Sequence, residues 1–120
     1  MIERAEVAIA LGPAEGALAA RADELQTWVA VHPHDATAWT LLGQTWARLD
    51  RPLRAVRADA EARAAIGDMS GAVERLRAGQ RMARSGTGAV DFIDVSVIDA
   101  RLREFEALRK QYAADERQNR

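Results

Sequence analysis

The sequence predicts an all-α fold: a right-handed α-solenoid of antiparallel helix pairs, about five helices in all, with a long carboxy-terminal capping helix. Three observations predict it. Apolar residues recur at helical spacing, Pro and Gly separate these segments, and no segment keeps the apolar–polar alternation of a strand. Of the 120 residues, 48% are hydrophobic but only 5% aromatic, which suits closely packed helices in one domain, residues 1–120.

The first two helices are expected at 13–31 and 36–49. Pro13 suits a helix start, where its missing N–H costs nothing, and His32-Pro33 ends the first helix. Asp35 can accept hydrogen bonds from the free N–H groups that open the second. The expected buried stripes are Leu18, Ala22, Leu25 and Val29 in the first helix, and Trp39, Leu42, Trp46 and Leu49 in the second.

The third helix is expected at about 53–66, after the break at Asp50-Arg51-Pro52, with Gly67 beyond its end. Residues 68–71 are expected to form a turn. The fourth helix is then marked by Ala72, Val73, Leu76, Gln80 and Met82. The Gly-rich stretch 85–88 is the one clear loop.

The fifth and longest helix is expected at about 92–115. Asp91 can cap it, with Val90 and Val95 placed to pack across the cap. A near-heptad stripe follows, and the opposite, solvated face carries Arg101, Glu104, Arg109 and Lys110. The stripe consists of Val95, Ile98, Leu102, Phe105 and Tyr112. It predicts a helix that lies over the others.

The segment from Trp39 to Trp46, Trp-Thr-Leu-Leu-Gly-Gln-Thr-Trp, resembles the first helix of a tetratricopeptide repeat. In that repeat the aromatic and Leu positions face neighbouring helices, and the Gly, here Gly43, lets two helices approach closely. Ala55 and Ala62 fall where the second helix needs small side chains. Asp59 and Gly67 depart from the pattern, because an apolar residue and a Pro are usual there.

Composition and motifs argue against several functions. The net charge is −1 with acids and bases mixed, which disfavours binding of nucleic acid or a membrane surface. There is no Cys, and His32 and His34 lack a third ligand at metal-binding spacing. Because catalytic and phosphate-binding motifs are also missing, we expect no enzyme activity and no cofactor in this chain.

A binding role therefore remains, and the second helix offers candidate residues for it. Residues that point away from its packing stripe would contact a peptide, and a strict 34-residue register adds two on the fourth helix. The candidates are Thr37, Thr40, Gln44, Arg48, Glu74 and Arg81. A solvated face is the alternative. We interpret Trp28, Trp39 and Trp46 as core residues.

From Leu25 onward the sequence also resembles the carboxy-terminal repeat domain of periplasmic zinc metallopeptidases of the beta-barrel-assembly-enhancing protease type. The similar segments are 54–68, 71–81, Asp91-Phe92-Ile93 and 96–102. The resemblance implies a repeat module excised from a longer periplasmic protein whose zinc protease domain acts on misassembled outer-membrane proteins. The zinc ligands and catalytic Glu of that family have no counterparts here.

Two functions remain open from the sequence. The first is a non-catalytic module that binds a peptide, a client or outer-membrane barrel-assembly components and so positions its own protease domain. No nucleic acid and no membrane insertion are expected. The second is a free-standing adaptor that forms a homodimer through the helix at 92–115, for which loss of the oligomer on Leu102→Glu would be the signature.

Overall fold

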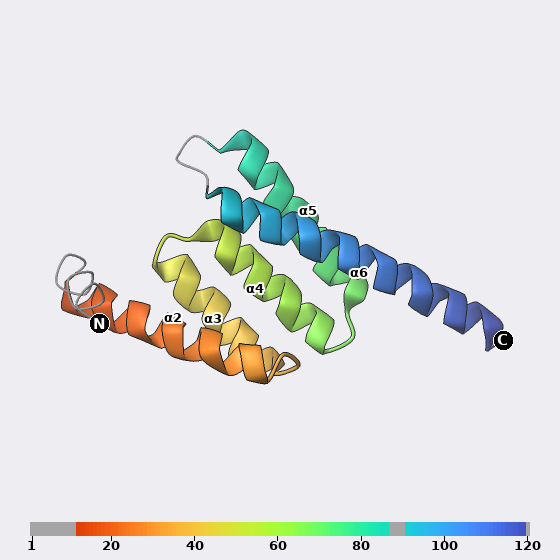
Figure 1. The fold of residues 1–120 in the computed structure, drawn as a ribbon, viewed down its shortest axis with the longest axis horizontal. Helices are drawn as coiled ribbons and strands as arrows, with labels where there is room; N and C mark the ends of the chain where they lie inside the picture. Colours follow the sequence, from red (N-terminus) through yellow and green to blue (C-terminus); the bar gives the residue numbers. More distant parts are fainter. Residues whose placement is uncertain (1–11, 87–90, 120) are drawn as a thin grey trace.

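The computed structural model describes residues 12–86 and 91–119, and these form five α-helices and no strand (Figure 1). The helices are α2 (Pro13–Val31), α3 (Ala36–Arg48), α4 (Pro52–Ala65), α5 (Met69–Ser85) and α6 (Phe92–Gln118). The predicted all-α class, the order of the helices and the long carboxy-terminal helix are confirmed. Residues 87–88 of the expected loop, and Val90 with its expected packing on Val95, lie outside the described residues.

Aspartates open three of the helices. The side chains of Asp35, Asp68 and Asp91 accept hydrogen bonds of 2.8 to 3.0 Å from the backbone N–H groups of Ala38, Gly71 and Ile93. The expected turn at 68–71 is therefore wrong, because the Asp68 cap starts α5 at Met69.

A glycine closes α4 where the repeat pattern favours Pro. Gly67 has φ +86°, a left-handed conformation that suits glycine, and its N–H donates to the Ala64 carbonyl at 3.0 Å. The Asp68 N–H donates to the Arg63 carbonyl at 2.9 Å, which completes the helix end. Asp59 is the second residue that departs from the repeat pattern, and it forms an ion pair with Arg75 of α5 at 2.7 Å. An ion pair thus joins α4 and α5 at a position where the repeat usually has an apolar residue.

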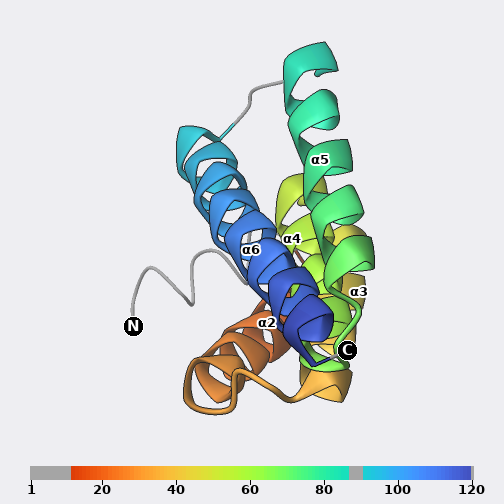
Figure 2. The same ribbon diagram turned by 90° about the vertical axis from the view of Figure 1, so that its right-hand side faces the viewer.

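Each helix packs against the next in sequence, and α6 also contacts α4. Figures 1 and 2 together show α2 and α6 on one side of the molecule, α3 and α5 on the other, and α4 between them. Within the described ranges, no Cα atom of α3 lies within 8 Å of one in α5. The carboxy-terminal part of α6 extends beyond the other helices (Figure 1).

Two apolar clusters share α4. Ala58 and Ala62 belong to the cluster with α2 and α3, whereas Leu53 and Ala60 belong to the cluster with α5 and α6. Alanines let α4 pack on both sides, because their small side chains allow neighbouring helices to come close. Gly43 acts similarly from α3, since a Cβ there would lie 3.4 Å from the Ala55 carbonyl oxygen and the Ala58 Cβ.

One core prediction is wrong and two hold. Trp39 and Trp46 are buried, but Trp28 is 49% exposed. Its indole N–H donates to Asp35 at 2.8 Å, and its ring lies 3.9 Å from that of His32. Trp28 therefore stabilises the α2–α3 turn instead of filling the core.

None of the helices in the described part of the chain is long and apolar enough to cross a membrane.

Candidate binding groove

A groove with a cavity volume of about 390 Å³ lies between α2 and α6. We call it the α2–α6 groove. One wall consists of Gln26, Val29 and Ala30 of α2, and the other of Ile93, Asp94 and Val97 of α6. Side chains of α3 and α4 form its floor: Trp39, Leu42, Trp46, Leu53, Arg54, Arg57 and Ala58. The groove thus joins parts of the chain that are up to 71 residues apart, since Gln26 and Val97 both line it.

Two arginines of α4 lie over the two buried indoles of the floor. The guanidinium carbon of Arg57 is 5.0 Å from the ring centroid of Trp39, and that of Arg54 is 4.8 Å from the centroid of Trp46. The Trp39 indole N–H donates to the Pro33 carbonyl at 2.9 Å. Since cations are attracted to the faces of aromatic rings, the indoles hold both guanidinium groups in place.

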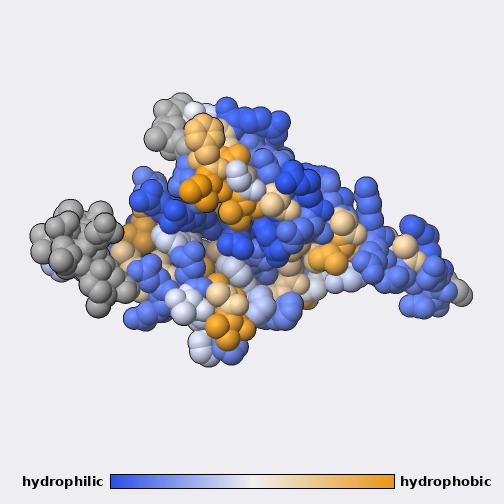
Figure 3. All heavy atoms as spheres, in the orientation of Figure 1, coloured by the Kyte–Doolittle hydropathy of each residue, from blue (hydrophilic) through white to orange (hydrophobic). Residues whose placement is uncertain are grey.

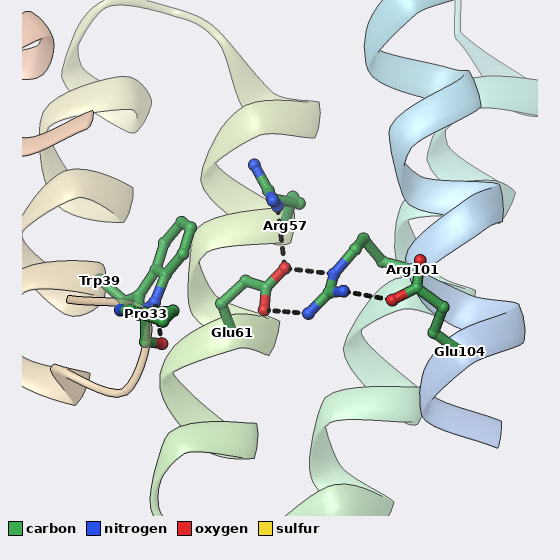
Figure 4. A network of polar contacts seen from close by, with 6 residues as sticks. All are labelled: Pro33, Trp39, Arg57, Glu61, Arg101 and Glu104. Atoms are coloured by element: carbon green, nitrogen blue, oxygen red, sulfur yellow. Dashed lines mark hydrogen bonds and ion pairs between the residues drawn. The ribbon is translucent and has the colours of Figure 1, made fainter. Parts of the chain in front are cut away.

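Carboxylates on α4 and α6 complete this arrangement. The Arg54 Nε–H donates to both oxygens of Asp94, at 3.0 and 3.2 Å. Glu61, buried on α4, accepts from Arg101 of α6 at 2.6 and 2.7 Å and from Arg57 at 3.0 Å (Figure 4). The hydrogen bond to Glu61 raises the pKa of Arg101 above its usual range. These pairs fix α6 on α4, and with it the wall of the groove.

The position of Arg101 corrects a prediction. The helical pattern put it on the solvated face of the last helix, but it contacts Glu61, and its guanidinium lies 4.5 Å from the Phe105 ring. The carboxylate that binds it is 40 residues away in sequence. Periodicity within one helix therefore carried no signal for the pair.

An apolar surface continues from the groove onto α6. Phe92 and Ile93 are exposed, Ile93 to 72%, and with Ser96, Val97 and Ala100 they line a shallow hollow. Figure 3 shows orange, hydrophobic spheres over this amino-terminal end of α6. The sequence did contain a signal for this surface, because Phe92, Ile93 and Val97 are apolar but lie off the buried stripe of Ile98, Leu102 and Phe105.

A second, shallower hollow lies between α3 and α4, and we call it the α3–α4 groove. It contains Thr37 and Thr40, two of the predicted site residues, together with Asp59, Arg63 and Ile66. Ile66 is 73% exposed. The Thr40 hydroxyl donates to the Ala36 carbonyl at 2.9 Å, within its own helix.

The other four predicted site residues lie outside both grooves. Gln44 and Arg48 are exposed further along α3, and Glu74 and Arg81 are exposed on α5. The Cα atoms of α3 and α5 stay more than 8 Å apart in the described ranges, so Glu74 and Arg81 are not next to the predicted residues of α3, and a common binding surface of the six residues stays a prediction.

The described residues contain no group of three or more His, Cys, Asp or Glu side chains that could hold a metal ion. Comparison with known protein families, with curated proteins and with solved structures finds no match to this chain. The geometry of the groove is therefore the main guide to function.

Proposed function

We propose that this chain is a non-catalytic helical-repeat module, of the tetratricopeptide-like α-solenoid class, that binds a peptide segment of a partner protein in the α2–α6 groove. One observation carries the proposal: an indole-floored groove has apolar side chains on both walls, and at its edge Ile93 is 72% exposed. Exposed apolar side chains that adjoin a groove mark interaction surfaces, because their burial by a partner is favourable.

Contacts within the chain itself hold the groove open. Its two walls, α2 and α6, have no Cα atoms within 8 Å of each other in the described ranges, so their separation depends on how each is attached to the floor. Arg54–Asp94 and Glu61–Arg101 attach α6 to α4. The buried cluster that contains Val29 of α2 and Trp39 of α3 attaches α2 to α3. A preformed groove costs little ordering on binding, which favours a useful affinity.

Self-association through the last helix is less favoured by the structure. The apolar stripe that would form the dimer seam is used inside the molecule, where Ile98, Leu102 and Phe105 are buried against α4 and α5. A second copy could use that seam only if α6 first left its own core. A segment of another protein is therefore the occupant that we propose.

The wider context of the proposal is a periplasmic zinc protease that acts in outer-membrane protein assembly. This part rests on the sequence resemblance alone. In this context the chain binds clients or barrel-assembly components and positions the protease domain, and the zinc ion belongs to that protease domain.

The binding proposal is tested with two matched variants. Peptides selected from a random display library on the wild-type chain are synthesised, and their affinities are measured by fluorescence anisotropy. We expect Ile93→Ser to weaken binding about tenfold or more, the equivalent of one apolar side chain losing its contacts. Ile66→Ser removes an equally exposed isoleucine from the α3–α4 groove and should leave binding unchanged.

If Ile66→Ser alone weakened peptide binding, the binding site would instead be the α3–α4 groove, which contains Thr37 and Thr40. Failure of every selected peptide to respond to Ile93→Ser would refute the proposed groove. The protease context is tested by capture from a detergent-solubilised Gram-negative envelope. Retention of barrel-assembly components or a zinc protease by wild type, but not by Ile93→Ser, supports it, and equal retention by both argues against it.

A further inference from the structure

We infer that the α2–α6 groove selects a segment in which an acidic side chain lies beside an apolar one. The carboxylate pairs with the guanidinium of Arg57, and the apolar side chain packs against Ile93 and Val97. This inference rests on the proposed function, because it names the kind of peptide that the same groove takes.

Arg57 has hydrogen-bond donors to spare. Its Nε–H donates to Glu61 at 3.0 Å, but its two terminal amino groups have no acceptor within residues 12–86 and 91–119. Its side chain is 32% exposed and lines the groove. A guanidinium with free terminal N–H groups presents a planar fork that matches a carboxylate.

Arg57 contacts a single carboxylate oxygen, and it shares that oxygen with Arg101. Both oxygens of Glu61 accept hydrogen bonds from Arg101, at 2.6 and 2.7 Å, and one of these oxygens also accepts from Arg57. Arg101 also pairs with Glu104, so the cluster holds two carboxylates and two guanidinium groups, but Arg57 itself contacts only one shared oxygen (Figure 4). An additional carboxylate beside Arg57 would accept hydrogen bonds from its terminal N–H groups.

Arg54, the other arginine of the floor, differs in this respect. It holds both oxygens of Asp94, and Asp91 lies 3.7 Å from one of its amino groups. Asp94 is the acidic residue that lines the groove, and its carboxylate is already bound. The terminal amino groups of Arg54 also make no hydrogen bond within residues 12–86 and 91–119, but two carboxylates lie beside it, whereas Arg57 contacts one shared oxygen. Arg57 is therefore the arginine of the groove that we assign to the ligand.

The position of Arg57 is set in advance. Stacking on Trp39 and the bond to Glu61 hold its guanidinium, so a ligand does not have to order a free arginine side chain. Because the surrounding indoles and aliphatic side chains displace water, a charged pair formed there is stronger than one on an open surface. The apolar surface of Ile93 and Val97 lines the same groove, so one short segment can contact both.

The display selection described above supplies the test. We expect the peptides enriched on wild type to carry Asp or Glu next to an apolar residue. Replacing that Glu by Gln in a synthesised peptide should weaken binding to wild type about tenfold, as for loss of a charged hydrogen-bonded pair. On Arg57→Gln, which keeps a donor for Glu61, the two peptides should bind within about twofold of each other.

A matched control and a salt series complete the design. Arg103→Gln changes an exposed arginine of α6 outside the groove and should preserve the full difference between the Glu and Gln peptides. Higher salt should reduce that difference, since ions screen a partly exposed pair. Thermal melts of each variant confirm that it is folded.

The outcomes separate the two proposals. Peptides that depend on Ile93 but bind equally well with Glu or Gln would overturn the acidic preference and leave the proposed function intact. A Glu preference that persists in Arg57→Gln would overturn the role of Arg57. If no selected peptide depends on Ile93, both the preference and the proposed groove are wrong.

Discussion

Arg101 of α6 binds both carboxylate oxygens of Glu61 of α4, at 2.6 and 2.7 Å, across 40 residues of sequence. Glu61 is buried, and Arg101 also pairs with Glu104 at 2.5 Å. The pair attaches the long last helix to the centre of the molecule. It therefore affects both the stability of the fold and the position of a groove wall.

We expect Glu61→Ala to lower the free energy of unfolding by about 2 kcal/mol, because it leaves two arginines without their shared carboxylate. The loss should be smaller than for a fully enclosed pair, since the Arg101 side chain is 28% exposed. Urea unfolding measures it. Arg103→Ala, on an exposed position of α6, is the control and should change stability by less than about 0.5 kcal/mol. Equal effects of the two variants would show that the pair adds nothing.

Two glycines allow a graded test of helix packing. At Gly43 a Cβ meets its nearest neighbours at 3.4 Å, an ordinary contact, so Gly43→Ala should be close to neutral. At Gly79 a Cβ would lie 3.0 Å from Val56 Cγ1 and 3.1 Å from Ile98 Cδ1, so Gly79→Ala should destabilise the fold by about 1 kcal/mol or more. Gly43→Leu should cost about 1–3 kcal/mol by overpacking. Chemical denaturation of the three variants checks the order, and an unchanged Gly43→Leu would contradict the close α3–α4 contact.

Leu102 and Tyr112 distinguish a core helix from a dimer seam. Both belong to the apolar stripe of α6, but Leu102 is buried and Tyr112 is half-exposed. We expect Leu102→Glu to unfold the protein in circular dichroism, because a charge would enter the core, and Tyr112→Glu to leave the melting temperature almost unchanged. Light scattering provides the second measurement. A folded Leu102→Glu with a halved mass would instead establish the dimer.

The pKa of Asp35 predicts a pH effect. The Ala38 backbone N–H, and next the Trp28 indole N–H, lower this pKa from its ordinary value of 3.8. Because the folded pKa is lower than the unfolded one, the ionised carboxylate stabilises the fold above pH 3.8, and this contribution is lost as the pH falls further. Asp35→Asn cannot titrate but can still cap α3. The melting temperature of Asp35→Asn should therefore lie below that of wild type at neutral pH, and the difference should shrink in acid. A difference that stays constant with pH would contradict the stabilising role of the ionised Asp35.

The sequence alone determined the helical class and most helix bounds. Pro13 and Pro52 begin α2 and α4, and the side chains of Asp35 and Asp91 cap α3 and α6. These effects act within a few residues of sequence. The buried stripes of α3 and α6 also followed from periodicity, since Trp39, Leu42 and Trp46, and Ile98, Leu102 and Phe105, are buried. The predicted turn at 68–71 is wrong, because Asp68 caps α5, which begins at Met69.

The tertiary structure decided which helices meet and therefore where a groove forms. Only packing brings Arg57, Trp39 and Ile93, from three helices, to one groove, while it leaves Thr37 and Glu74 on helices whose Cα atoms stay more than 8 Å apart. It also decided that Trp28 stays exposed and that Arg101 meets Glu61. The physical reason is that local sequence fixes the ends and faces of each helix, whereas the contacts between faces depend on how all five helices pack together.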